Sequence, residues 1–212
     1  RIVDTDMGRI VHTGDTHIGY LQYHLSSRRE DFLEAFRKVV QDAIEGEFDA
    51  IVHAGDLFHK SNPDLIDIAG TIEILQLAKD NIPVLAVVGN HEMQRRIQWI
   101  DVFERLGLVT HLGKDPYIIE DKKGNVAIYG MDYVHPNGRE GLDYQFEDSS
   151  SKYKILVSHG QFAPLALVPG RDTWDIEKIL KSSSVRFDAV LLGDEHIQKQ
   201  KKIGDVWVTY CG

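Results

Sequence analysis

The sequence predicts an α/β fold, a two-sheet β-sandwich flanked by helices. Two observations lead to this prediction. Apolar runs of strand length alternate with amphipathic helical patterns through the first half of the chain. In the second half, segments typical of β-hairpins join the strands and helices. Such a mixture favours two packed sheets with helices on their outer faces.

Five apolar runs of strand length each end in polar residues that can bind metal ions or take part in catalysis. Each run stops at Gly-Asp, Gly-Asn-His or Ser-His-Gly. The runs are RIVHTGDTH at 9–17, AIVHAGDLFH at 50–59, VLAVVGNHE at 84–92, KILVSHG at 154–160 and AVLLGDEHIQ at 189–198. In addition, residues 117–131 are typical of a hairpin with its turn at 122–125, and 205–212 of a final strand.

Helix signals lie between these runs. Ser27 and Glu30 have capping-box spacing ahead of a helical apolar pattern over 32–44. Asn62-Pro63 predicts the start of a helix that runs through residue 80. Two further helices are expected over 98–107, ended by Gly107, and over 173–183, capped by Thr173. The polar segment 132–152 is expected at the surface.

Length and composition describe an ordinary globular chain of 212 residues with 42% hydrophobic residues and a net charge of −9. No apolar run approaches the roughly 20 residues that cross a bilayer, so we expect no membrane association. The single cysteine, Cys211, excludes an internal disulfide and fits a cytoplasmic location. Residues 1–6 precede a natural-looking start at Met7 and are interpreted as an added leader, with one domain over 7–212.

The residues at the ends of the predicted strands have side chains that bind metal ions. In open α/β sheets, ligands bind beyond the carboxyl ends of the strands. A mixture of carboxylate, imidazole and amide groups without thiolate suits divalent manganese, iron, magnesium or zinc rather than a Cys-rich structural site. Two ions sharing a bridging carboxylate, about 3.5–4 Å apart, would use so many ligands. The candidates are Asp15, His17, Asp56, Asn90, His91, His159, Asp194 and His196.

Each of these residues also has an ordinary structural interpretation. Asp-x-His can be a polar loop, Gly-Asp a turn, Asn-His a helix cap, and His159 a hydrogen-bonded loop histidine. The prediction of a site therefore depends on the ordered series of motifs, each placed after a strand.

The series resembles the calcineurin-like metallophosphoesterase superfamily. Within it, GDTHIGYLQYH, HAGDLFHKSNP and VVGNHEM are similar to the family of SbcD and Meiotic Recombination Eleven, DNA nucleases of double-strand-break repair, and favour an archaeal source. The resemblance extends over the chain from residue 9. It implies the calcineurin-like fold and a metal-dependent DNA exo- and endonuclease that hydrolyses phosphodiesters with a two-metal-activated water.

The resemblance also implies a role for each motif. Asp56 would bridge two ions, most simply manganese. His91 would lie near the scissile phosphate as proton donor or charge stabiliser, and His59 would position the substrate strand; a helix cap and an exposed loop histidine are the alternatives. Asp15, His17 and His196 would bind the first ion, and Asn90 and His159 the second. No role is expected for His12, His24, His53, His111 and His135.

The fifth motif departs from the family pattern. The family has Gly-His-x-His there, whereas this chain has Gly-Asp-Glu-His at 193–196. Because side chains alternate along an extended segment, Asp194 and His196 can face the ions together while Glu195 points away. We expect Asp194 to bind the second ion; a place just outside the ligand shell is the alternative.

The resemblance further implies partners. They are DNA, an SMC-like ABC ATPase of the SbcC type, and a second copy of the chain. The second copy would bind through helices near 64–75 or 95–107, although packing in the core explains the apolar stripes of these segments equally well. The family's DNA-contacting capping domain and ATPase-binding segment are expected to follow the core and to lie beyond residue 212. Arg95 and Arg96 could contact the phosphodiester backbone; Arg28 and Arg29 could too, although helix solvation is the simpler interpretation for those two.

Two other functions use the same residues. A phosphomonoesterase or cyclic-nucleotide phosphodiesterase would hold the same ions. A catalytically weak structural subunit that recruits an ATPase is the third possibility. The segment GYLQYH at 19–24 favours the nuclease.

Overall fold

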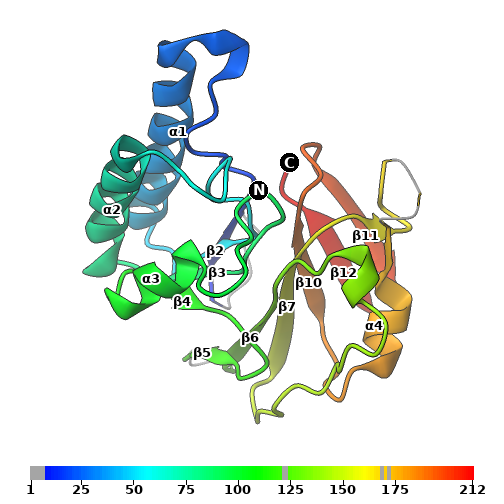
Figure 1. Cartoon of the computed structure of the whole chain (residues 1–212). Coiled ribbons are helices and arrows are strands. Elements are labelled where there is room, and N and C mark those ends of the chain that lie inside the picture. The colour runs from blue at the N-terminus through cyan, green and yellow to red at the C-terminus, as the bar shows by residue number, and fades with distance from the viewer. Residues whose placement is uncertain (1–7, 121–123, 168–169, 171–172) are drawn as a thin grey trace.

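Two sheets face each other at the centre of the molecule (Figure 1). The computed structural model describes residues 8–120, 124–167, 170 and 173–212. The first sheet is wholly parallel in the order β1-β2-β3-β4. Its strands are β1 (Ile10–Thr13), β2 (Ala50–His53), β3 (Val84–Ala86) and β4 (Thr110–His111).

The second sheet has six strands in the order β11-β12-β10-β7-β6-β5. Its four inner strands are parallel, and the edge strands β5 and β11 are antiparallel to their neighbours. A short parallel pair, β8 with β9, lies apart. The bounds are β5 (Tyr117–Ile119), β6 (Val126–Met131), β7 (Tyr153–His159), β8 (Phe162–Ala163), β9 (Trp174–Asp175), β10 (Ala189–Gly193), β11 (Lys199–Ile203) and β12 (Val206–Tyr210).

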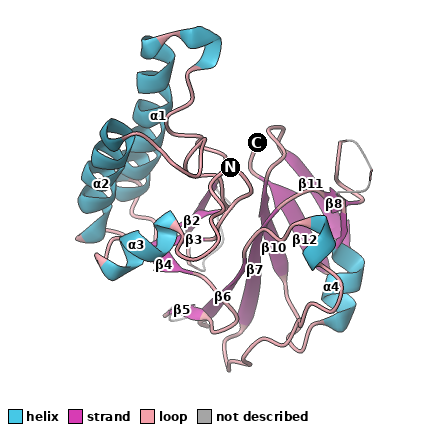
Figure 2. Cartoon of the chain, viewed as in Figure 1, coloured by secondary structure: helices cyan, strands magenta, loops and turns pink. Residues whose placement is uncertain are grey.

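Helices cover the outer faces of both sheets (Figure 2). Three of them, α1 to α3, pack on the first sheet, and α4 packs on the second. Two 3₁₀ turns, η1 (Gln22–His24) and η2 (Pro136–Gly138), lie in the connections. The α-helices are α1 (Ser26–Glu45), α2 (Leu65–Lys79), α3 (Trp99–Arg105) and α4 (Ile176–Ser182). The predicted fold class, two sheets flanked by helices, is confirmed.

Alternation along the central strands builds the core. In β2, Ile51 packs against the helices while Ala50 and Val52 pack against the second sheet. In β7, Leu156 packs toward α4 and Val157 toward the first sheet. All five side chains are fully buried, as expected for strands covered on both faces.

The predicted helix starts are wrong by a few residues. Helix α1 begins at Ser26 after Leu25, so Ser27 lies inside the first turn and makes no cap. Helix α2 begins after Asp64, beyond Asn62-Pro63. Helix α4 is capped by Asp175, whose Oδ1 accepts from the Lys178 amide at 3.2 Å, whereas Thr173 Oγ1 accepts from Gly170. Residues equally suited to capping stand close together, and only the packed chain selects one.

The remaining elements agree with the sequence except at one edge. The chain turns at Gly107, with φ of 66°, after α3, and β5 with β6 forms the predicted hairpin, whose turn lies partly outside the described residues. Segment 132–152 contains no strand or α-helix. Strand β11 was not predicted, because its lysines do not alternate with apolar residues. No helix among the described residues has the length and apolarity to cross a membrane.

Gly130 sets how closely the two sheets approach. It lies in β6, and its amide donates to Gly113 just beyond β4 at 2.8 Å. A Cβ at Gly130 would overlap Leu112 Cβ and lie 2.6 Å from the Leu112 carbonyl carbon and oxygen. The contact therefore admits only glycine.

We expect Gly130→Ala to lower the free energy of unfolding by about 1–3 kcal/mol, the usual effect of overpacking a core. Gly113→Ala is the matched control, because a Cβ there meets nothing within 4 Å. Urea unfolding followed by circular dichroism measures both variants. Equal stability of the two would contradict this account of the sheet contact.

Candidate metal centre

The carboxyl ends of five strands meet at one edge of the sandwich. Loops after β1, β2 and β3 come from the first sheet, and β7 and β10 from the second. Four residues in these loops have a left-handed backbone, which costs non-glycine residues energy and is common at functional sites. They are Asp15, His17, Asp56 and Asp194, with φ of 52°, 42°, 57° and 101°.

A first group of metal-ligand atoms comes from Asp15, His17 and His196, all within 4.8 Å of one another. His17 Nε2 lies 3.3 Å from His196 Nε2, and His196 Nε2 lies 3.8 Å from Asp15 Oδ1. The Asp194 amide donates to both Asp15 oxygens at 3.0 and 2.9 Å, which fixes that carboxylate.

A second group comes from Asp15, Asp56 and His159. His159 Nδ1 donates to the Ala54 carbonyl at 2.7 Å, so Nε2 of the neutral ring carries a lone pair. That lone pair faces oxygens of three other side chains. The distances are 2.9 Å to Asn90 Oδ1, 3.4 Å to Asp56 Oδ2 and 3.6 Å to Asp194 Oδ1.

Such a set of facing acceptors fits a cation. Lone pairs that point at one another without a proton between them repel, and a bound divalent ion removes the repulsion. Nitrogen and oxygen ligands without sulfur suit divalent metal ions. Asp15 belongs to both groups, and Asp56 of the second group also approaches the first, since its Oδ2 is 3.8 Å from His17 Nε2. The structure therefore brings all seven predicted ligands together.

Burial and neighbouring charges shift the pKa values of the buried groups in the site. Burial raises the pKa of Asp15 and lowers that of His17 to about 4. Burial also opposes charge on His159, but Asp194 and Asp56 outweigh it and hold the His159 pKa well above its usual range. Burial would raise the Asp56 pKa as well, yet the hydrogen bond with His159 keeps it below its ordinary value.

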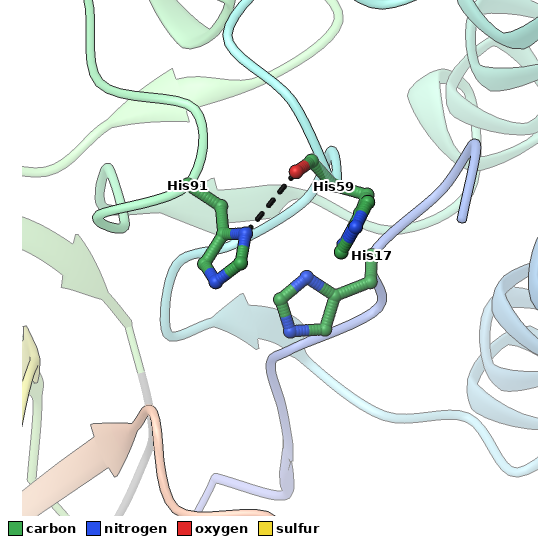
Figure 3. A group of neighbouring side chains, drawn as sticks. All are labelled: His17, His59 and His91. Atoms are coloured by element: carbon green, nitrogen blue, oxygen red, sulfur yellow. Dashed lines mark hydrogen bonds between the residues drawn. The ribbon is translucent and has the colours of Figure 1, made fainter. Parts of the chain in front are cut away.

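His59 and His91 lie next to the ligand His17 (Figure 3). The ring centroids of His17, His59 and His91 lie 4.8 to 5.4 Å apart. His91 Nδ1 donates to the His59 carbonyl at 3.1 Å, which leaves Nε2 free to exchange a proton, and the His91 side chain is exposed. His59 stacks on Tyr20 with centroids 4.2 Å apart, and burial lowers its pKa.

The predicted arginines lie in different surroundings. Arg95 and Arg96 are exposed on the loop between His91 and α3. Arg29 forms ion pairs with Asp64 and Asp67 of α2 at 2.6 Å, so it joins two helices. Arg28 binds Gln22 and Asp31. For Arg28 and Arg29 the structure thus favours the helical interpretation over contact with a substrate.

Two acidic side chains beside the ligands face away from them. Glu92 is 1% exposed and accepts from the Phe58 and Gly89 amides at 3.1 and 3.2 Å, so it links two ligand loops. Burial raises its pKa to about 7. Glu195 accepts from the Leu167 amide at 2.8 Å, outside the ligand groups, so it points away as expected, although Asp194 has a φ of 101° and the segment is not extended. The sequence places Glu92 next to a motif, but it does not indicate which backbone amides donate to the Glu92 carboxylate.

His111 is a second residue whose place the sequence did not indicate. Its Nδ1 lies 2.8 Å from Asp101 Oδ1 of α3, and its Nε2 lies 3.0 Å from both oxygens of Asp132, which follows β6. Burial opposes charge on the ring, but the two carboxylates outweigh it and raise the His111 pKa to about 9. The three residues lie on different elements, with Asp101 10 residues and Asp132 21 residues from His111, and the fold brings them together.

Comparison with known proteins points to one family. The family model for calcineurin-like phosphoesterases matches residues 8–198. Proteins called DNA double-strand break repair protein Mre11 are similar in sequence: that of Haloferax volcanii is 51% identical over 97% of this chain and 45% of its own length, and that of Halobacterium salinarum is 49% identical over 97% and 51%. The chain spans about half the length of these relatives.

Two solved structures share the fold at low sequence identity. The protein TT1561 of Thermus thermophilus has a TM-score of 0.62 at 16% identity, covering 96% of this chain and 88% of its own. The phosphopantetheinyl hydrolase of Mycobacterium tuberculosis has a TM-score of 0.64 at 12% identity, covering 97% and 89%.

The His111 ion pairs should make the free energy of unfolding depend on pH. The pKa of His111 is higher in the folded protein than in the unfolded chain. The stabilisation from its ion pairs is therefore fully present below about pH 6.5, the pKa of an unfolded histidine. It is lost as the pH rises through about 9. In chelator-treated protein, His111→Gln should lower the free energy of unfolding by roughly 1–2 kcal/mol near pH 6, after discounting for solvent screening. The deficit should vanish near pH 10. A deficit that does not change with pH in urea titrations would contradict the assigned ion pairs.

Proposed function

This chain belongs to the calcineurin-like phosphoesterase family, and from that premise we propose that it is the core of a metal-dependent DNA exo- and endonuclease of double-strand-break repair. The observation that carries the proposal is the convergence of nitrogen and oxygen ligand atoms from both sheets around Asp56 and His159. The likeness to Mre11 proteins over 97% of the chain supports DNA phosphodiesters as the substrate.

The seven ligands would divide between two ions. Asp15, His17 and His196 would hold the first, Asn90, His159 and Asp194 the second, and Asp56 would touch both. Manganese fits the mixture of imidazole and oxygen ligands. When bound, such ions supply an activated water near neutral pH and neutralise the phosphate oxygens.

The remaining residues act on the substrate. His91 presents Nε2 at the exposed side of the site, so this nitrogen can give a proton to the departing sugar oxygen. Stacking on Tyr20 orients His59 to position the nucleic acid strand. Arg95 and Arg96 lie on the loop that carries His91, where their charges can contact the phosphodiester backbone.

The partners follow from the same likeness. We propose that DNA, an SMC-like ATPase and a second copy of the chain bind it. Leu65 and Ile66 at the start of α2 are 83% and 70% exposed, and Leu106 after α3 is 52% exposed. These side chains lie on the two helical regions that the resemblance implies for dimerisation, and their exposure supports an interface there.

One assay separates the possible functions. Purified protein with manganese is given linear duplex DNA, a single-stranded circle and p-nitrophenyl phosphate. Cleavage of both DNAs supports the proposal. Hydrolysis of p-nitrophenyl phosphate alone would indicate a phosphomonoesterase, and no hydrolysis of any substrate would indicate a structural subunit.

We expect His91→Ser to abolish DNA hydrolysis while both manganese ions remain bound. The reason is that the side chain donates a proton and binds no ion, and its backbone amide bond to Asp56 Oδ1 at 2.9 Å is kept. Calorimetric manganese titration and a nuclease assay test this together. His135→Ser, which changes an exposed histidine outside the site, is the control. Loss of an ion in the His91 variant would refute the assignment.

Asp194 should determine how the second ion responds to acid. A carboxylate stays ionised to about pH 4, whereas a histidine ligand becomes protonated near pH 6.5 and then releases its metal. His159 binds this ion in both proteins, and Asp194→His adds a second histidine ligand, so the wild-type protein should retain more of its second manganese ion at pH 5 than Asp194→His does. Manganese retained after gel filtration at pH 5 and 7 gives the answer. Identical retention would place Asp194 outside the ligand shell.

A further inference from the structure

The loop over residues 89–98, between β3 and α3, carries Asn90 and His91 together with the two exposed arginines. Its first end is fixed by the second sheet. Just before the loop, the Val88 amide donates to Asp132 Oδ1 at 2.8 Å, and the Tyr133 amide donates back to the Val88 carbonyl at 2.9 Å. Asp132 therefore determines where the loop leaves the sheet.

The other end of the loop is fixed by α3. The Gln98 amide donates to Asp101 Oδ2 at 2.7 Å in a capping box. Asp101 thus holds the residue at which the loop enters the helix.

One imidazole joins both carboxylates. His111 Nδ1 lies 2.8 Å from Asp101 Oδ1, and Nε2 lies 3.0 Å from Asp132. Both contacts are donated by the ring only when it is an imidazolium, and the pKa of about 9 keeps it so at neutral pH. His111 is itself held in β4, in register with Ala86 of β3, and its amide donates to Glu104 at 2.8 Å.

We infer that His111 is a positioning residue: through Asp132 and Asp101 it holds both ends of the 89–98 loop and so sets Asn90 and His91 against the ligands of the second sheet. The inference rests on the proposed function for its catalytic consequence. The anchoring of the loop at both ends does not depend on that function. Misplacement of such groups by about 1 Å can slow a reaction on the order of a hundredfold.

The test compares His111→Gln with Arg29→Gln. Arg29 bridges Asp64 and Asp67 between α1 and α2, just as His111 bridges Asp101 and Asp132, so both variants remove a cation that joins two carboxylates. The side chains of His111, Asp101 and Asp132 are 19%, 29% and 35% exposed, so the substitution opens no buried cavity. Asp132→Asn is a second variant that weakens the same link if His111→Gln does not fold.

Hydrogen exchange in metal-free protein is the first measurement. The variant should exchange at least about tenfold faster in peptides covering Val88 and residues 94–98, because the open state of the loop becomes more populated. Amides of α1 and β7 that exchange through local opening should stay at the wild-type rate, and Arg29→Gln should change α1 and α2 instead. Exchange that is unchanged, or faster by one common factor throughout the chain, would overturn the inference.

Manganese binding and kinetics are the second measurement. His111→Gln should weaken the ion on the Asn90 side about tenfold and leave the ion held by Asp15, His17 and His196 unchanged, while kcat for DNA falls and KM changes little. Equal weakening of both ions would overturn the inference. If the wild-type protein cleaves no DNA, the proposed function fails, but hydrogen exchange and metal binding still decide the role of His111.

Discussion

The contact between Asp56 and His159 is the interaction on which the site depends. Asp56 belongs to the first sheet and His159 to the second, and their side chains are 2% and 0% exposed with 3.4 Å between Oδ2 and Nε2. Because the Ala54 carbonyl occupies the other ring nitrogen, the facing atoms carry no proton in the neutral state. Buried acceptors in this arrangement require a positive charge between them. Protonation supplies it in the metal-free protein, and a divalent ion would supply it in the proposed enzyme.

The fold maintains this unfavourable arrangement by over-determining the backbone around it. Asp15 and Asp56 have left-handed φ values, which persist only where surrounding contacts hold them. A Cβ at Gly89 would overlap Asp56, so the loops of two neighbouring strands are in direct backbone contact there. Glu92 also joins these two loops, because its carboxylate accepts a hydrogen bond from a backbone amide in each. Contacts from both loops thus hold the left-handed backbone of Asp56 in place.

The net charge of −9 affects how such a protein could bind DNA. Long-range attraction to a polyanion is absent, so affinity has to come from a local field. The ligand carboxylates make the metal-free edge still more negative, and two divalent ions would reverse its sign. The exposed arginines of the 89–98 loop would add to that local field, which links substrate binding to metal occupancy in the proposed mechanism.

The sequence by itself determined the fold class and the seven candidate ligands, because each ligand directly follows an apolar run whose end is visible in the local pattern. It could not determine the helix starts at Ser26, Leu65 and Ile176, since several capping residues stand side by side there. Only the tertiary structure decided which side chains surround the ligands. Glu92 accepts from a loop 34 residues away, and His111 joins Asp101 and Asp132 across two sheets. These contacts depend on distances between segments that no local pattern encodes, because they arise when the two sheets pack together.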